Sequence, residues 1–200
     1  MITQLSFDDL TLETQRLRLT PMRAEDVDIS KAVRCDSRVM RYVDDAMTPE
    51  DVEADMVNSV KRGAGGRIGL WVITRKDTGA KIGTSVLMPV PIEEDDYDWS
   101  LLVPVAYPDA NIEVGYLFVP DAWGQGFATE ACSRLVRFAF EETALTEIVA
   151  TTDPENVNSH NVLQKSGLRK IGIKRAYAWD DVLWFDLSRD RWAATNETRP

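Results

Sequence analysis

A short glycine-rich turn, Gly124-Gln125-Gly126, separates an apolar stretch from an amphipathic one and is the clearest chemical feature of the sequence. Glycines at a helix N-terminus let backbone N–H groups approach an anion closely, and the helix dipole favours negative charge there. The turn could therefore bind the phosphates of a nucleotide. It lacks the Gly-Lys-Ser/Thr ending of a P-loop, and Thr129 stands where a dinucleotide fingerprint needs a third glycine. Taken by itself, the motif is explained more simply by an ordinary tight turn.

Among the ionisable residues, Glu113 stands out because it lies in an otherwise apolar stretch, two residues before Gly115. We expect its carboxylate to face a groove, where it could accept a proton as a general base. A structural salt bridge at a sheet edge is the alternative. The single histidine, His160, excludes multi-histidine metal sites, and we expect no metal. Cys35 and Cys132 are too few for a disulfide framework or a metal knuckle, and Cys132 is interpreted as a small packing residue.

Hydrophobic periodicity predicts a mixed α/β chain, with antiparallel hairpins before a strand–helix–strand unit that contains the glycine turn. The predicted elements are strand 16–20, helix 24–33, a helix from Thr48 to about Arg62, strands 68–75 and 80–88, strand 111–119, a helix over about 127–143, strand 148–151, helix 156–166, and strands 169–179 and 182–189. Residues 89–110 carry four prolines and are predicted as a loop or irregular hairpin at the edge of the sheet. Residues 193–200 are predicted as a polar, flexible tail.

The chain has 200 residues, of which 44% are hydrophobic, so we expect a single domain over 1–200 with a core over about 12–192. Its 23 basic and 33 acidic residues give a formal net charge of −10. That charge argues against nucleic acid and against an anionic membrane surface as partners. No stretch is long and apolar enough to span a bilayer, and the first ten residues lack the basic flank and apolar run of a signal peptide. We therefore expect a cytoplasmic protein with reduced cysteines.

Four segments, in order, resemble the GCN5-related N-acetyltransferase (GNAT) superfamily, and look most like its RimJ/RimL-like ribosomal-protein-alanine acetyltransferase branch. The segments are Leu12-Glu13-Thr14-Gln15-Arg16-Leu17-Arg18-Leu19, Ile112-Glu113-Val114-Gly115-Tyr116, Trp123-Gly124-Gln125-Gly126-Phe127-Ala128-Thr129-Glu130-Ala131, and the stretch from Asn156 to Leu168. The resemblance covers about residues 12–192. It implies a GNAT fold with a central, mixed, mostly antiparallel twisted sheet of about seven strands and about four flanking helices. It also implies a V-shaped splay between two central parallel strands, here 111–119 and 147–152.

The resemblance further implies an enzyme that transfers an acetyl group from acetyl-CoA to a primary amine by direct attack in a ternary complex. The implied acceptor is a protein N-terminus or a small amine, and a cationic acceptor and a homodimer are both compatible with the family. The pyrophosphate is expected on the turn amides, and the pantetheine arm in the splay, held by backbone groups of Leu117 and Val119. The implied acetyl-CoA-binding residues are Leu117, Phe118, Val119, Trp123, Gly124, Gln125, Gly126, Phe127, Ala128, Thr129, Asn156, Ser159 and Lys165.

Two catalytic roles follow from the resemblance. Glu113 would take the proton from the incoming ammonium, and Ser159 would support the leaving sulfur. Many superfamily members have a tyrosine for the second task at the position of Leu163, and this chain departs from them there. Asn156 and Ser159 are also good helix-capping residues, which is an equally simple interpretation.

The acidic run Glu93–Asp98 is interpreted first as a solvated loop, because blocks of like charge are usually solvent-exposed. Its functional alternative is a surface that attracts a cationic acceptor. Two other functions for the whole chain also stay open. One is a non-catalytic, acyl-CoA-binding regulatory module on the same fold, and the other is a nucleotide-binding domain that uses Asp153 as its ribose acid.

Overall fold

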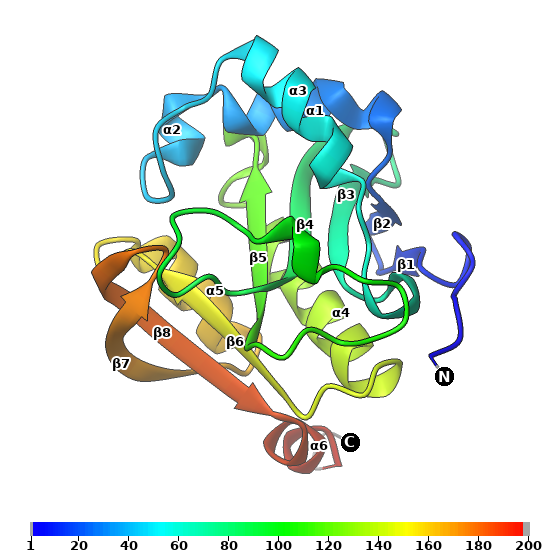
Figure 1. Cartoon of the computed structure of the whole chain (residues 1–200), viewed down its shortest axis with the longest axis vertical. Coiled ribbons are helices and arrows are strands. Elements are labelled where there is room, and N and C mark those ends of the chain that lie inside the picture. Colours follow the sequence, from blue (N-terminus) through cyan, green and yellow to red (C-terminus); the bar gives the residue numbers. More distant parts are fainter. Residues whose placement is uncertain (1, 198–200) are drawn as a thin grey trace.

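One sheet of eight strands runs through the molecule in the order β1-β2-β3-β4-β5-β6-β8-β7 (Figure 1). The computed structural model describes residues 2–197. The strands are β1 (Leu12–Glu13), β2 (Leu17–Pro21), β3 (Gly69–Arg75), β4 (Lys81–Pro89), β5 (Ile112–Phe118), β6 (Glu147–Thr152), β7 (Arg169–Ala176) and β8 (Trp179–Ser188). Among these strands, only β5 and β6 pair in parallel. The predicted fold class is therefore confirmed, with the short β1 added to the expected strands.

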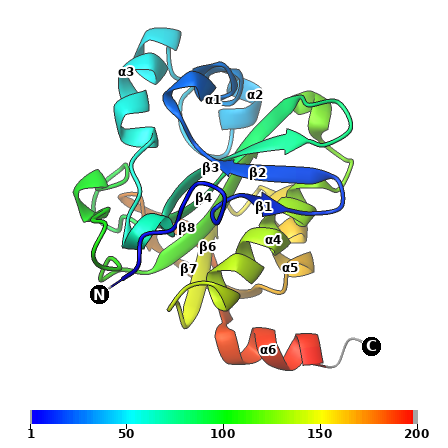
Figure 2. The ribbon, with the colours of Figure 1, turned by 90° about the vertical axis from the view of Figure 1, so that its right-hand side faces the viewer.

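Helices cover both faces of this sheet. They are α1 (Val27–Arg34), α2 (Ser37–Met40), α3 (Pro49–Ser59), α4 (Phe127–Glu141), α5 (Val157–Lys165) and α6 (Arg189–Glu197). Figures 1 and 2 show α1, α2 and α3 gathered at one end of the molecule, and α6 at the other. None of the helices in residues 2–197 is long and apolar enough to cross a membrane.

Of the three buried hydrophobic clusters in the described residues, two meet at β5. The larger one joins α4 to the sheet through residues such as Leu135 and Phe138, and it includes Val114 of β5. A smaller cluster on the opposite face is formed by Met22, Ile29, Val33, Met56 and Val72, and Leu117 of β5 packs against it. Because successive strand residues point to opposite faces, β5 contributes side chains to both clusters.

Several local predictions are confirmed by the geometry of turns and caps. Thr48 caps α3 through its side chain, which accepts a hydrogen bond from Asp51 N–H at 3.2 Å. Gly79 in the β3–β4 turn and Gly167 after α5 have φ of 70° and 95°, a region that glycine reaches without strain. Residues 90–111 form no strand and hold only the short 3₁₀ segment η3 (Trp99–Leu101).

The C-terminal part differs from the prediction, because residues 193–197 belong to α6 and do not form a tail. This polar helix is anchored at its start by tertiary contacts. Arg189 donates to the carbonyl oxygens of Leu145 and Thr143, at 3.1 and 2.8 Å, and the Trp192 ring lies 5.6 Å from the Phe140 ring. Such contacts cannot be seen in the local pattern. The predicted tail residues 198–200 lie outside the described residues.

Two buried tryptophans give a matched test of core energetics. Trp71 is 0% exposed and its Nε1 donates to Leu10 O at 2.9 Å, whereas Trp184 is 3% exposed and its Nε1 has no acceptor among the described residues. We expect Trp71→Phe to reduce the free energy of unfolding by about 1–3 kcal/mol more than Trp184→Phe, because only the first change leaves a buried carbonyl without its donor. Urea denaturation of both variants measures the difference, and equal losses would contradict the explanation.

Candidate active site

The two parallel strands at the centre of the sheet separate soon after they meet. The register between β5 and β6 has one pair, Glu113 opposite Val149, whereas β4 pairs with β5 along the full length of β5. Figure 1 shows the two strands diverging from that point. The predicted splay between the parallel strands is confirmed, and it leaves one edge of β5 without a neighbouring strand beyond Glu113.

The register decides which backbone groups border this gap. Val119 N–H donates to Ile82 O at 3.0 Å, and Asn111 O accepts from Val90 N–H at 2.9 Å, with a continuous ladder between them. Hydrogen-bonded positions alternate along an antiparallel pair, so Leu117 also directs its N–H and C=O at β4. The prediction that backbone groups of Leu117 and Val119 border the gap is therefore wrong by one residue.

The residues between them take that place. The N–H and C=O of Tyr116 and Phe118 point away from β4, toward the gap. The carbonyl of Phe118 already accepts a hydrogen bond from Trp123 Nε1 at 2.8 Å. Trp123 itself is 49% exposed, beside the glycine turn. Tyr116 N–H and C=O and Phe118 N–H are thus the β5 groups that a molecule lying in the gap would meet.

The glycine turn presents a row of backbone donors at the C-terminal end of β5. Gly124 and Gly126 have φ of 72° and 78°, and Gly126 is the N-cap of α4. The first hydrogen bond of this helix is Glu130 N–H to Gly126 O at 3.1 Å. Within residues 2–197, the N–H groups from Gly124 to Thr129 donate to no other group. Such a row, at the positive end of a helix dipole, is suited to phosphate oxygens.

The turn is held in place from the N-terminal side of the chain. Arg16 donates from Nη1 to Gln125 O at 3.0 Å and from Nε to Glu130 at 2.6 Å, and its guanidinium lies 4.5 Å from the centre of the Phe127 ring. Thr14 Oγ1 also donates to Glu130, at 2.6 Å. Although partial burial raises the pKa of Glu130, the hydrogen bonds from Thr14 and Arg16 outweigh it and hold that pKa below its usual range. The carbonyl side of the turn is therefore fixed, and its N–H side remains available.

Glu113 lies on the face of the sheet opposite α4, at the point where the gap begins. Glu113 is 4% exposed, so its side chain does not face open water. One carboxylate oxygen accepts from the hydroxyls of Tyr97, at 2.7 Å, and Tyr177, and the other accepts from Thr151 Oγ1 at 2.8 Å. Burial raises the pKa of Glu113, and these three hydrogen bonds oppose that rise. No basic side chain in the described part of the chain pairs with it, which argues against the salt-bridge alternative.

Ser159 lies on the other face, in the first turn of α5. Its N–H donates to the side chain of Asn156 at 3.2 Å, so the capping interpretation of Asn156 is confirmed. The Ser159 hydroxyl is 3.0 Å from the Tyr116 hydroxyl, and either can be the donor. Burial raises the pKa of Tyr116. Leu163 is 1% exposed and belongs to the core, so the hydroxyl beside Ser159 comes from β5 and not from α5.

Lys165 is the predicted binding residue that lies farthest along its element. It is exposed in the last turn of α5, about 9 Å farther along the helix axis than Ser159, given a rise of about 1.5 Å per residue. Its side chain has no hydrogen bond or ion pair among the described residues. Its role toward a phosphate stays a prediction.

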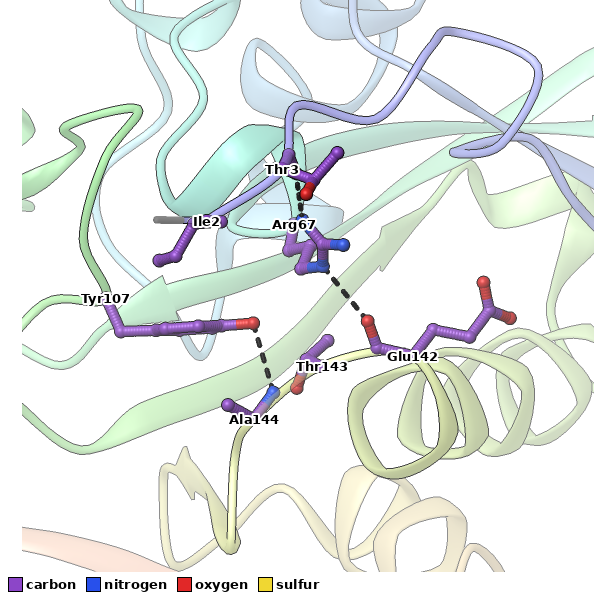
Figure 3. Close-up of a pocket in the computed structure, with 7 residues that line it drawn as sticks. All are labelled: Ile2, Thr3, Arg67, Tyr107, Glu142, Thr143 and Ala144. Carbon is purple, nitrogen blue, oxygen red and sulfur yellow. Dashed lines mark hydrogen bonds between the residues drawn. The ribbon is translucent and has the colours of Figure 1, made fainter.

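A cavity of about 300 Å³ lies elsewhere, near the starts of β5 and β6 (Figure 3). It is lined by Ile2, Thr3, Arg67, Tyr107, Glu142, Thr143 and Ala144. Its polar groups bind one another: Arg67 donates to the carbonyl oxygens of Thr3 and Glu142, and Ala144 N–H donates to Tyr107 Oη. A neighbouring hollow is lined by the first residues of both strands, Ile112 and Glu147 among them. Both hollows are therefore at the opposite end of these strands from the glycine turn.

Sequence reasoning missed five residues of this arrangement: Arg16, Tyr97, Tyr116, Thr151 and Tyr177. The sequence places Arg16 only within a predicted strand and a family-like segment, and Tyr97 only within an acidic run. Their contacts reach across 109 residues from Arg16 to Gln125 and across 64 from Tyr177 to Glu113. A buried acid in an apolar strand needs hydroxyl or basic partners, and that need was the one signal available for Tyr97 and Tyr177.

The diverging parallel pair and the donor-lined turn at its end define an acetyltransferase architecture. Residues 16–169 match the family described as "Acetyltransferase (GNAT) domain", and the chain belongs to that family. A similar protein is the "Uncharacterized N-acetyltransferase YnaD" of Bacillus subtilis, with 25% identity covering 90% of this chain and 98% of the relative. Another is the "FsC-acetyl coenzyme A-N(2)-transacetylase" of Aspergillus fumigatus, with 30% identity covering 80% of this chain and 66% of the relative.

Solved structures show the same fold at lower identity. An acetyltransferase from Agrobacterium tumefaciens superposes with a TM-score of 0.71 and 21% identity, covering 92% of this chain and 97% of that one. The RimL ribosomal L7/L12 acetyltransferase in complex with coenzyme A gives 0.68 and 11%, covering 90% and 99%. Spermidine N-acetyltransferase from Vibrio cholerae, in complex with CoA and spermine, gives 0.67 and 15%, covering 90% and 99%.

Proposed function

We propose that this protein transfers an acetyl group from acetyl-CoA to a primary amine, by direct attack of the amine within a ternary complex. The observation that carries the proposal is the row of unpartnered N–H groups from Gly124 to Thr129 at the end of the gap between β5 and β6. These donors suit a pyrophosphate, and the free backbone groups of Tyr116 and Phe118 suit the amide-containing arm of coenzyme A. Acetyl-CoA, when bound, supplies the activated acyl group.

We assign to Glu113 the role of general base, which accepts the proton that the acceptor ammonium must lose. An ammonium has no electron pair for attack, so it must first lose a proton to a base. Glu113 is the carboxylate at the start of the gap, and its three hydroxyl partners stabilise it as an anion in spite of its burial. Burial raises its pKa, which brings it closer to the working pH of a general base.

We assign to Ser159 the role of supporting the leaving sulfur through its hydroxyl group. Because the Tyr116 hydroxyl can donate to Ser159 Oγ, the Ser159 proton is free to point at the sulfur. Tyr116 thereby orients the Ser159 hydroxyl, which takes over the task that many superfamily members give to a tyrosine at the position of Leu163. The N–H groups of β5 that face the gap can polarise the thioester carbonyl.

Direct attack is favoured over a cysteine relay. Cys132 is 0% exposed in α4, and burial raises the pKa of its thiol to about 12. The thiol form is a poor nucleophile compared with the thiolate. Cys132 therefore acts as the packing residue that its helical position predicts.

The acceptor is proposed to be an amine that is positively charged before reaction. Tyr97 lies within the acidic run 93–98, whose other five residues are Asp or Glu. Glu93 of this run pairs with Arg175, near the turn that carries Tyr177. A negative field beside Glu113 favours an ammonium over a neutral or anionic acceptor. Among the similar structures, RimL is named as an alpha-N-protein acetyltransferase and another as a spermidine N-acetyltransferase. A protein N-terminus and a polyamine are both amines that carry a positive charge before reaction.

Acetyl-CoA is expected to raise the melting temperature, and NAD and ATP are not. At 100 times its Kd a ligand adds about 2.7 kcal/mol of stability, which corresponds to a rise of about 5–10 °C for a chain of this size. Thermal unfolding monitored by tryptophan fluorescence measures the shift. NAD and ATP are suitable controls because they share an adenosine diphosphate unit with acetyl-CoA. Stabilisation by NAD and not by acetyl-CoA would support the nucleotide-binding alternative and reject the acyltransferase.

Turnover is tested separately by an acceptor screen that follows thiol release from acetyl-CoA. The panel should include spermidine, short alkylamines and peptides with free N-termini. Thiol release above the rate without acceptor, with an acetylated product in the mass spectrum, supports the enzyme. Binding of acetyl-CoA without any turnover across the panel would instead support a regulatory acyl-CoA-binding module.

A further inference from the structure

The carboxylate of Glu113 is enclosed by hydroxyl groups from three separate elements. Tyr97 comes from the loop between β4 and β5, Thr151 from β6, and Tyr177 from the turn between β7 and β8. A carboxylate offers about four lone-pair directions, and three are used here. Figure 1 shows the 90–111 segment beside the β7–β8 turn, in front of β5. The two tyrosine rings meet edge to face, with centres 5.9 Å apart.

The turn that carries Tyr177 has an unfavourable backbone. Tyr177 and Ala178 form the two-residue loop between the paired residues Ala176 and Trp179, and both have positive φ, of 52° and 59°. Such a loop normally takes Asn-Gly, because a Cβ is disfavoured in this region. Strain of this kind persists where surrounding contacts over-determine it, and it is concentrated at functional sites.

Those surrounding contacts join the turn to the loop that carries Tyr97. Tyr177 N–H donates to Pro91 O at 3.0 Å, and Ala178 N–H donates to Ile92 O at 3.2 Å. The two loops therefore form one cover over the carboxylate. Both tyrosine side chains are only partly exposed, and Glu113 beneath them is buried.

Among the described residues, no basic side chain contacts Glu113 to balance its charge. Its cross-strand neighbours are Met88 on β4 and Val149 on β6, both apolar. Its pKa is raised by burial and lowered by the hydroxyls of Tyr177, Tyr97 and Thr151, with no contribution from a charged group. Asp96 acts on Tyr97, whose own pKa is raised by burial and by Glu113. The three hydroxyls are thus what stabilises the anion.

We propose that Tyr97 and Tyr177 are positioning residues for the acetyl transfer: their hydroxyls orient the Glu113 carboxylate and stabilise it as an anion, and their loops keep water from it. The inference rests on the proposed base role of Glu113. In the reaction, the acceptor ammonium loses one N–H proton to Glu113 and the nitrogen keeps the electron pair for attack. On this proposal, the acceptor approaches Glu113 past these two loops, one of which carries the acidic residues 93–98.

The electrostatic part is tested by stability measurements that need no acceptor. A carboxyl whose pKa is raised on folding makes the protein less stable as pH rises from its unfolded pKa through its folded pKa. The wild type should lose stability relative to Glu113→Gln over that window and then level off, and the levelling pH reports the folded pKa of Glu113. Tyr97→Phe and Tyr177→Phe, each compared with the same protein carrying Glu113→Gln, should move the levelling pH upward by about one unit or more.

Tyr107→Phe is the matched control, because the Tyr107 hydroxyl accepts from Ala144 N–H near the starts of β5 and β6 and contacts no carboxylate. It should leave the levelling pH of Glu113 unchanged. If both Tyr97→Phe and Tyr177→Phe behave like this control, the inference is overturned. If one variant does not fold, the other decides the outcome, since their hydroxyls donate to the same oxygen.

The catalytic part is tested by the pH dependence of kcat/KM, with the best acceptor from the screen. The acid limb should move to higher pH by about one unit or more in each variant, because the base must be ionised to act. A loss of stability without movement of the acid limb would mean a structural role only, and would overturn the positioning role. If no amine is acetylated, the proposed function fails, and the stability series still decides whether the tyrosines stabilise the anion.

Discussion

Glu113→Gln is expected to lower kcat by about 10²-fold or more at neutral pH, because a positioned general base typically contributes about 10²–10⁴-fold. The glutamine keeps the size of the side chain. Its oxygen can still accept from Tyr97 and Tyr177, and its amide can donate to Thr151. The fold and the binding of acetyl-CoA should therefore be retained, and the loss should be confined to the chemical step. Thiol release measured across the pH range gives both kcat and its pH dependence.

Glu147→Gln provides the control for this result. Glu147 is an exposed acid at the start of β6, on the strand next to Glu113 in the sheet, and the same change of charge there should leave kcat unaltered. A pH–rate profile that is the same in Glu113→Gln and in the wild type would remove Glu113 from the base role. Loss of acetyl-CoA binding in Glu113→Gln would point to a structural role for Glu113.

Gly126→Ala is expected to weaken the binding of acetyl-CoA by about 10²-fold or more. Gly126 has φ of 78° at the N-cap of α4, in the middle of the row of free N–H groups. A Cβ there disfavours the left-handed backbone and obstructs the close approach of a phosphate. Loss of two hydrogen bonds to a charged group, at about 1.5–3 kcal/mol each, corresponds to at least that factor. Titration of intrinsic fluorescence or calorimetry measures the Kd.

Gly79→Ala separates the backbone cost from the effect on the ligand. Gly79 has φ of 70° in the β3–β4 turn, and an added Cβ would meet nothing within 4 Å. Both substitutions should reduce the free energy of unfolding by about 1–2 kcal/mol, which is the cost of a Cβ in the left-handed region. Only Gly126→Ala should change the Kd for acetyl-CoA. Equal affinities in the two variants would show that the turn does not hold the phosphates.

The strands and helices that could be predicted from the sequence are those with a local cause. The N-cap Thr48, the turn glycine Gly79 and the helix-ending Gly167 each adopt the expected local geometry, because capping and positive φ depend on a few neighbouring residues. The short β1 and the helices α2 and α6 were not predicted. Helix α6 is held by tertiary contacts, such as those of Arg189 with Leu145 and Thr143, and the carbonyl of Glu13 in β1 accepts from Arg134 of α4.

The candidate site divides in the same way. The positions of the glycine turn and of Glu113 follow from spacing and from a charge in an apolar strand. The direction of the β5 backbone groups does not, because a shift of one residue in register exchanges the two edges of a strand. The prediction of Leu117 and Val119 failed for that reason, and Tyr116 and Phe118 take their place at the gap.

The sequence by itself determined the family-typical order of elements, the donor-rich turn Gly124-Gln125-Gly126 and the unusual acid Glu113, because each is encoded within one short segment. Only the tertiary structure decided what surrounds that acid. Its hydroxyl partners lie 16, 38 and 64 residues away along the chain, on a loop, a strand and a turn. Their meeting depends on the pairing of β6 with β8 and on the hydrogen bonds between two loops, which no local pattern specifies.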